Sequence, residues 1–374
     1  MSSGAWKRYR RFGVGLAGLL ALGACKEEPP PAAQPSAEAA EGAAEKKPAV
    51  DQKIANAVAA AEATARSEAG ASNGQAAPPP DGILGAEAAA REVAPGAPAQ
   101  IVLGGEGSAP RVRLGAGRLS PGPGPTGKLV LDYRSGGSVM PTIEFELKPK
   151  VVPAGAATQP ASVPPAPAAG EGNLLLSYAL GGARPADDQP GRLPENARAE
   201  IAKLNGSTID LVTLPNGALV EQRHKLAGKN ADLEPIVAGG GEALAALALP
   251  YPDVPVGAGA FWMVKSRETM DGTPVIAYRM IKLLELGAGG AAKLSINTRR
   301  YLIEPTMAMP GLPPHQVRRF ESEGEATLSI KPGSSFPDSA DTRDAFMALV
   351  TPNDRPNQAL PLRSELSAKV SFQR

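Results

Sequence analysis

Three long strand-like runs separated by tight turns, in the last third of the chain, constrain the fold more than any other feature. The runs are residues 259–268, 273–286 and 292–304, and the turns between them contain Asp271-Gly272 and the glycine-rich segment 287–290. Turns this short join antiparallel neighbours, because a parallel pair needs a crossover of a dozen or more residues. The pattern therefore predicts an antiparallel sheet, which residues 317–331 and 363–372 extend.

Upstream segments show the same pattern. In residues 141–148 the apolar Ile143, Phe145 and Leu147 alternate with polar residues, the period of two that is typical of a half-buried strand. Asn216-Gly217 lies between two such runs and is a strong hairpin signal. The further predicted strands are residues 99–103, 110–114, 128–133, 173–180, 208–213 and 218–223.

Helical patterns are short and few. They cover residues 82–94, 193–207 and 241–250, and no regular alternation of strand and helix accompanies them. We therefore predict a mostly β (α+β) fold, a large twisted antiparallel meander sheet or half-barrel with one or two short helices over one face. Cys25 is the only cysteine, so an aliphatic core without an intramolecular disulfide must stabilise the fold.

The amino-terminal segment is typical of an exported protein. Lys7, Arg8, Arg10 and Arg11 precede the uncharged apolar run 12–24. That run matches the apolar region of a signal peptide and is shorter than the ~20 residues of a membrane span. The alternatives are an anchor helix or a buried core helix, and a core helix does not usually begin at the amino terminus after four clustered cations.

The end of this run carries a resemblance to a known class of precursors. Leu22, Gly23 and Ala24 before Cys25 resemble the lipobox of bacterial lipoprotein precursors. A cysteine is needed there because its thiolate can accept a diacylglyceryl group. The resemblance implies signal-peptidase recognition of residues 22–24, cleavage before Cys25, and lipid attachment to Cys25. The expected partners are the lipoprotein-processing enzymes and the membrane, which the acyl chains enter.

The resemblance also implies a place in the cell envelope. Lys26 follows the cysteine, whereas an aspartate at this position retains lipoproteins in the inner membrane of enteric bacteria. This favours the outer membrane. The sequence does not indicate which face of that membrane the domain occupies.

These patterns divide the chain into three parts. Residues 1–24 are the cleaved signal peptide. Residues 25–81 comprise the lipidated cysteine and a disordered tether rich in Ala, Pro and Glu, with a helix expected at 50–69. Residues 82–374 form a single β-rich domain with a disordered loop at 153–171, which joins strands of one sheet.

Two segments carry a second resemblance. Residues 249–264, in which Pro-Val-Gly at 255–257 precedes Trp262, and residues 304–337 resemble a group of uncharacterised lipoproteins of myxobacteria. The sheet of that group resembles the half-barrel of the lipoprotein-carrier fold (LolA and LolB types). The resemblance spans about residues 98–374 and implies a curved sheet with a helical lid that holds acyl chains. It carries over no catalytic residue.

Motifs for phosphate or metal chemistry fail on physical grounds. Residues 122–129 (GPGPTGKL) approach a phosphate-binding loop, but Leu129 replaces the hydroxyl that binds Mg²⁺. Pro123 and Pro125 also remove backbone donors. His224 and His315 have no motif partner. We predict no catalytic residue, no metal and no cofactor.

Charged residues on the strands follow the spacing of solvent-facing positions. Glu144 and Glu146 lie about 7 Å apart by strand rise, a distance that also suits a glycosidase pair. Glu321, Glu323 and Glu325 show the same spacing, and Arg299, Arg300, Arg318 and Arg319 are candidates to meet them across strands. Trp262, Met263, Met280 and Ile281 are predicted in the core.

Composition limits the function. The formal net charge of +1 gives no general field for nucleic acid. Our first hypothesis is a non-enzymatic, membrane-anchored lipoprotein that binds an apolar ligand or lipid in a β half-barrel. The alternative is a structural or interaction lipoprotein with a solid core that binds an envelope protein. A cavity of several hundred Å³ would favour the first, whereas a solid core with an exposed apolar patch would favour the second.

Overall fold

The computed structural model describes residues 79–114, 120–135, 138–153, 173–186, 193–214, 216–270, 272–309, 312–331, 334, 336–352 and 357–373. The predicted signal peptide, the tether up to residue 78 with its helix at 50–69, and the loop at 153–171 past its first residue lie outside these ranges. Within the ranges, no helix is long and apolar enough to cross a membrane.

In these ranges fifteen strands form one sheet, and two short strands form a separate pair. The pair is β2 (Arg111–Val112) with β10 (Val256–Gly257). The sheet contains β1 (Gln100–Gly105), β3 (Gly122–Pro123), β4 (Gly127–Ser135), β5 (Ser138–Val139), β6 (Ile143–Pro153), β7 (Leu174–Pro185), β8 (Thr208–Thr213), β9 (Leu219–Lys225), β11 (Phe261–Met270), β12 (Thr273–Leu286), β13 (Ala292–Leu302), β14 (Thr306–Met309), β15 (Leu312–Ile330), β16 (Ser339–Thr351) and β17 (Leu360–Phe372).

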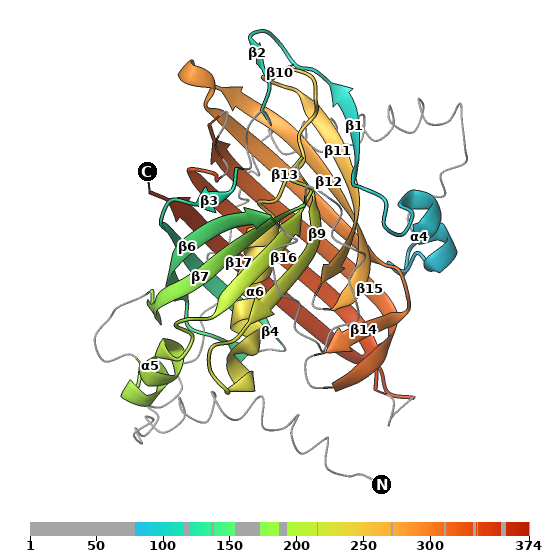
Figure 1. Ribbon diagram of the computed structural model, residues 1–374. Coiled ribbons are helices and arrows are strands. Elements are labelled where there is room, and N and C mark those ends of the chain that lie inside the picture. The colour runs from blue at the N-terminus through green and yellow to red at the C-terminus, as the bar shows by residue number, and fades with distance from the viewer. Residues whose placement is uncertain are drawn as a thin grey trace, which may run out of the picture. The chain divides into compact units, whose positions relative to one another are not determined.

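Two antiparallel meanders make up most of the sheet (Figure 1). The first runs β4-β6-β7-β8-β9 and the second runs β11-β12-β13-β15-β16-β17. The last strand, β17, pairs with β4 and joins the meanders, while β1 adds to the far side of β11. Every strand pairing in the sheet is antiparallel, so the predicted fold class is confirmed. The sheet is not closed, and its edges are β9 and β1.

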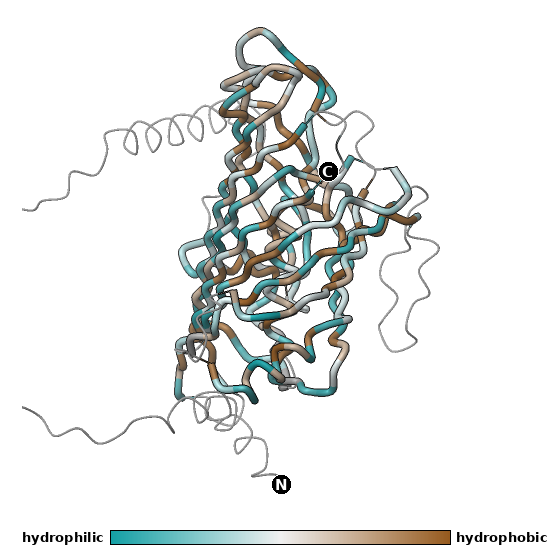
Figure 2. The backbone as a smooth tube through the Cα atoms, turned by 90° about the vertical axis from the view of Figure 1, so that its left-hand side faces the viewer, coloured by the Kyte–Doolittle hydropathy of each residue, from teal (hydrophilic) through white to brown (hydrophobic). Residues whose placement is uncertain are grey.

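Alternation of side chains gives the sheet an inner and an outer face, which Figure 2 shows as alternating teal and brown along the strands. Ile143, Phe145 and Leu147 are buried as their pattern predicted, and Trp262 is fully buried. Ile281 also belongs to the core. Met263 and Met280 differ from the prediction, because they are half-buried on the outer face.

Three α-helices occur in the described ranges: α4 (Ala86–Glu92), α5 (Glu195–Ala202) and α6 (Glu234–Ala245). Two 3₁₀ turns, η3 (Ala231–Leu233) and η4 (Ala288–Gly290), complete the elements. The outer face of β12 is covered by α4, whose Ala89 packs with Ile276 and Ile303. Lys265 on β11 fixes α4 through an ion pair of 2.9 Å with Glu92.

The helix α6 lies on the inner face, where it contacts β4, β8, β9, β16 and β17. It begins and ends earlier than the predicted helix at 241–250 and contains three consecutive glycines, Gly239, Gly240 and Gly241. A Cβ on Gly240 would lie 3.2 Å from Ile209 Cδ1 and 3.4 Å from Leu129 Cδ2. The missing side chains let the helix backbone approach the sheet, and this packing outweighs the low helix propensity of glycine.

Candidate functional site

A band of polar side chains crosses the inner face of six strands, β11, β12, β13, β15, β16 and β17. We call it the polar band. The strands contribute Ser266, Glu268, Arg279, Thr298, Arg300, Ser322, Thr342, Asp344 and Ser364, and α6 adds Glu242. On every one of these strands the inner positions on either side of the band are apolar.

The polar band separates two apolar clusters. The larger cluster includes Trp262, Ile281 and Leu294 and continues under α6. The smaller cluster includes Met270, Val275 and other residues at the opposite ends of the same strands. Charged groups inside an apolar interior usually cost stability relative to well-packed hydrophobic residues. Polar and charged side chains nevertheless occupy inner positions on six neighbouring strands. Because they are retained despite this cost, the polar band is a candidate functional site.

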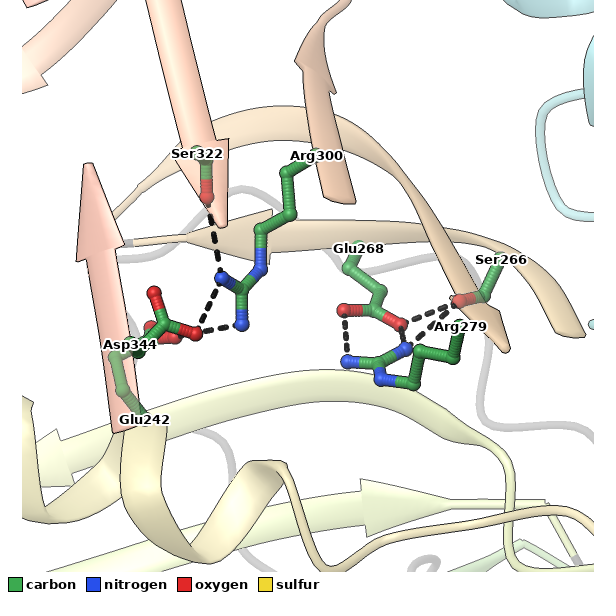
Figure 3. Close-up of polar contacts among 7 residues, drawn as sticks. All are labelled: Glu242, Ser266, Glu268, Arg279, Arg300, Ser322 and Asp344. Atoms are coloured by element: carbon green, nitrogen blue, oxygen red, sulfur yellow. Dashed lines mark hydrogen bonds and ion pairs between the residues drawn. The ribbon is translucent and has the colours of Figure 1, made fainter. Parts of the chain in front are cut away.

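Glu268 and Arg279 form the most buried part of the band. Arg279 Nη2 donates to Glu268 Oε2 at 2.8 Å, and Arg279 Nη1 donates both to the second carboxylate oxygen and to Ser266 Oγ (Figure 3). Ser266 also donates to the carboxylate. Burial alone would raise the pKa of Glu268, but Arg279 and Ser266 outweigh burial and hold that pKa below its ordinary value.

Arg300 organises the other half of the band. Its Nη1 donates to Asp344 Oδ2 at 2.6 Å and to Ser322 Oγ at 3.4 Å, and its Nη2 lies 3.7 Å from Glu242 Oε2 (Figure 3). Burial opposes the charge of Arg300, but Asp344 and Glu242 outweigh it and raise the pKa. The contact with Glu242 links the sheet to α6.

A cavity of about 30 Å³ lies between α6 and the polar band. Its walls include Glu242 and Asp344, beside the apolar side chains of Met270, Phe346 and Leu366. At ~10–15 Å³ for each water, the space holds about two water molecules. This is roughly a tenth of the volume that a drug-sized apolar ligand needs, so this cavity does not hold such a ligand.

Two buried polar atoms of the band have no hydrogen-bond partner among the described residues. They are Arg279 Nε and Thr342 Oγ1. Such atoms usually bond to protein, water or ligand. The band therefore has hydrogen-bonding capacity left, although its acids and bases are largely paired with one another.

The predicted lipidation site lies outside the described ranges. Nothing in the structure bears on Leu22, Gly23, Ala24 or Cys25.

The histidines and the glutamate pair do not form a catalytic constellation. His224 on β9 lies 3.4 Å from Glu234 at the start of α6, and His315 pairs with Met307 across β14 and β15. Glu144 makes ion pairs of 2.5 Å with both Lys128 and Arg184, whereas Glu146 lies 3.5 Å from Lys148. Burial would raise the pKa of Glu144, but its two cations lower it, which keeps the carboxylate ionised.

The other motifs occupy structural positions. Gly122 and Pro123 form β3, and the strand β4 follows, a context that does not suit phosphate binding. Arg299 meets Glu323 across strands at 3.4 Å, as predicted, and Arg319 pairs with Glu321 on its own strand. Arg300 does not meet these glutamates, because it points inward to Asp344. In the described ranges, no group of three acidic, histidine or cysteine side chains can hold a metal ion.

Four charged members of the band were not singled out from the sequence: Glu242, Glu268, Arg279 and Asp344. A signal existed for Glu268, because it lies an even number of residues after the inward Trp262. Asp344 gave no comparable signal, since its strand was not predicted.

Comparison with known proteins gives no family. No family model and no curated protein matches the chain. One solved structure that matches is described as "Lipid-protein interactions in lipovitellin", with a TM-score of 0.35 and 12% sequence identity. The match covers 69% of this chain and 26% of that chain, so this chain spans about a quarter of its length. A similarity this low decides nothing about function.

Proposed function

We propose that this protein is a non-enzymatic lipoprotein of the cell envelope, anchored in the outer membrane by acyl chains on Cys25, whose curved sheet binds an apolar ligand or lipid. The observation that supports binding is the occupancy of the inner face by α6. Aliphatic side chains line that face, and the glycine-rich α6 covers it at β4, β8, β9, β16 and β17. A covering element of this kind can be exchanged for a ligand.

The three glycines make α6 a weak helix by itself. Glycine in a helix interior is about 1 kcal/mol less favourable than alanine, so α6 depends on its contacts with the sheet. Its displacement would expose Leu129, Ile209 and Leu366, which lie beneath the glycines. The inner face would then offer an apolar surface bordered by the polar band.

The polar band favours a ligand with one polar end. An acyl chain would replace α6 on the apolar inner face, and its polar group would meet one of the two residues that have hydrogen-bonding capacity left, Arg279 on β12 or Thr342 on β16. Because the acids and bases of the band pair with one another, the proposed role is binding rather than catalysis.

A second candidate function rests on the small size of the cavity. A space of about 30 Å³ does not hold an acyl chain. If α6 never leaves the sheet, the protein is a solid-core lipoprotein that supports the envelope or binds an envelope protein.

The anchor is tested by changing Cys25 to Ala in cells that express the full chain. We expect loss of metabolic labelling by a palmitate analogue and loss of the mature protein from the membrane fraction. Lys26→Ala is the control, which leaves the cysteine intact and should retain the label. Labelling that survives Cys25→Ala would show that the lipobox interpretation is wrong.

Ligand binding is tested with a photoreactive fatty acid in cells that express the full chain. If the sheet binds acyl chains, crosslinks will map by mass spectrometry to inner-face peptides of β4, β17 and α6. A disulfide that fixes α6 supplies the control. A Cβ on Gly241 would lie 3.5 Å from Gln222 Cγ, so Gln222→Cys with Gly241→Cys is expected to link α6 to β9.

The oxidised and reduced forms of that double variant separate the two functions. Loss of crosslinking on oxidation and its return on reduction would support exchange of α6 for a ligand. Absence of inner-face crosslinks in the wild type would contradict ligand binding and favour the solid-core function.

A further inference from the structure

The two edges of the sheet differ in how they are protected. At one edge, β9 carries Glu221, Arg223 and Lys225 and lies against β11. Charged side chains and a covering element are the means by which natural edge strands avoid pairing with another chain. At the other edge, β1 (QIVLGG) has no charge and no proline. Among the described strands only β11 pairs with β1, so its second side is open (Figure 1).

The open strand is held firmly in a shape that suits pairing. Ile101 and Leu103 point inward and pack against the main core, and Leu103 lies opposite the fully buried Trp262. Val102 points outward and is 47% exposed. An edge that is already ordered loses little conformational entropy when another strand adds to it.

An apolar row on the outer face leads to this edge. Val102 on β1 lies opposite Met263 on β11, which lies opposite Met280 on β12. Both methionines are half-buried. The row ends at the open side of β1, where Val102 has a neighbour on one side only.

We propose that β1 is an interaction edge that pairs antiparallel with β1 of a second copy of this chain. A two-fold axis near the middle of the strand would place the same surface on both partners, as a symmetric dimer requires. Two identical strands that pair with each other bring like charges close together if they carry any. Because β1 carries no charge, this repulsion does not arise. The apolar row would then continue from Met280, Met263 and Val102 into the same three residues of the second copy.

Cysteine crosslinking in cells tests this pairing in the full chain. Residues directly opposite each other in an antiparallel pair have Cβ atoms about 4.5–5.5 Å apart, which allows a disulfide after small shifts. We expect Val102→Cys to give a disulfide-linked dimer on a non-reducing gel. Leu284→Cys is the matched control, because Leu284 is 40% exposed and lies on β12 away from the edge. The wild-type chain is the second control. Cys25 is its only cysteine, so any disulfide-linked dimer that it forms must join two copies of Cys25.

A second measurement does not depend on disulfides. In the detergent-solubilised full chain, Val102→Lys places two like charges across the axis and is expected to weaken the dimer by about tenfold. Leu284→Lys should leave the dimer mass in native mass spectrometry unchanged. Because Val102 contributes little to the core, loss of folding is not expected to account for the difference.

Three outcomes would overturn the proposal. Crosslinking of Val102→Cys no stronger than that of Leu284→Cys, together with a monomeric mass, would show that the edge is not a dimer interface. A Val102→Cys crosslink to a chain of another mass would assign the edge to a different protein. An intramolecular crosslink to Cys25 would assign it to the amino-terminal segment of the same chain.

Discussion

Asp344 on β16 reaches Arg300 on β13 at 2.6 Å, although the strand β15 lies between their strands. The register explains how they meet, because Gly324 on β15 lies opposite both Thr298 and Asp344. A Cβ at position 324 would lie 2.7 Å from Asp344 Oδ2. The absent side chain thus leaves the space through which the two charged groups approach each other.

This space predicts that Gly324→Ala destabilises the protein. The new methyl group would push Asp344 away from Arg300, and overpacking of this kind costs about 1–3 kcal/mol. Urea denaturation of the full chain measures the free energy of unfolding. Gly181→Ala is the control, because the nearest atom to its Cβ would be Glu146 O at 4.0 Å. Equal effects of the two substitutions would contradict the role assigned to Gly324.

Removal of one partner from the Glu268–Arg279 pair should cost more. Arg279→Met leaves a fully buried carboxylate without its main cation, a change that typically costs about 3–5 kcal/mol. The double variant Glu268→Leu with Arg279→Met removes both charges and is expected to lie much closer to the wild type. A double-mutant cycle by urea denaturation checks this, and simple additivity of the two single effects would show that the residues do not act as a pair.

The same pair predicts how stability changes with pH. The pKa of Glu268 in the folded chain lies below the value of 4.5 expected when unfolded. Between the two values the unfolded chain binds a proton that the folded chain does not, so stability decreases as the pH falls. The contribution of Glu268 is therefore complete above pH 4.5 and is lost as the pH falls through the folded-state pKa. The free energy of unfolding, measured from about pH 6 to about pH 3, should fall less steeply for Glu268→Gln than for the wild type.

The sequence predicted the sheet well where hydrophobic alternation and turn chemistry agree. The strands β8 and β12 have the predicted bounds, and both are flanked by glycine-containing turns. The strand β16 was missed because the inner positions of its first half are Ala340, Thr342 and Asp344, small or polar residues that face α6 and the polar band. Small and polar side chains at these positions remove the apolar alternation that identifies a strand.

The polar band itself depends on information that a single strand does not contain. Arg300 resembles its neighbour Arg299 in the sequence, yet one is buried and the other is exposed. Only the register of three strands shows that Arg300 faces Asp344. The position of α6 was missed for a related reason, since Gly239, Gly240 and Gly241 disfavour a helix until a sheet packs against them.

The glycines of α6 supply the last prediction. The three atoms nearest to a Cβ on Gly241 would all belong to the flexible Gln222 side chain, with Nε2 closest at 2.4 Å, and this side chain can turn away. Gly241→Ala should therefore gain helix propensity and stabilise the protein by about 0.5–1 kcal/mol. Gly240→Ala is the matched comparison. Its methyl group would press on Ile209 and Leu129, which are fully buried, so it should gain nothing or lose stability.

Hydrogen exchange of residues 234–245 connects this prediction with function. If α6 leaves the sheet when a ligand binds, Gly241→Ala should slow exchange in the helix and also reduce inner-face crosslinking by the photoreactive fatty acid. Slower exchange with unchanged crosslinking would mean that the acyl chain binds without displacing α6. The stability of this one helix would then not control access to the inner face.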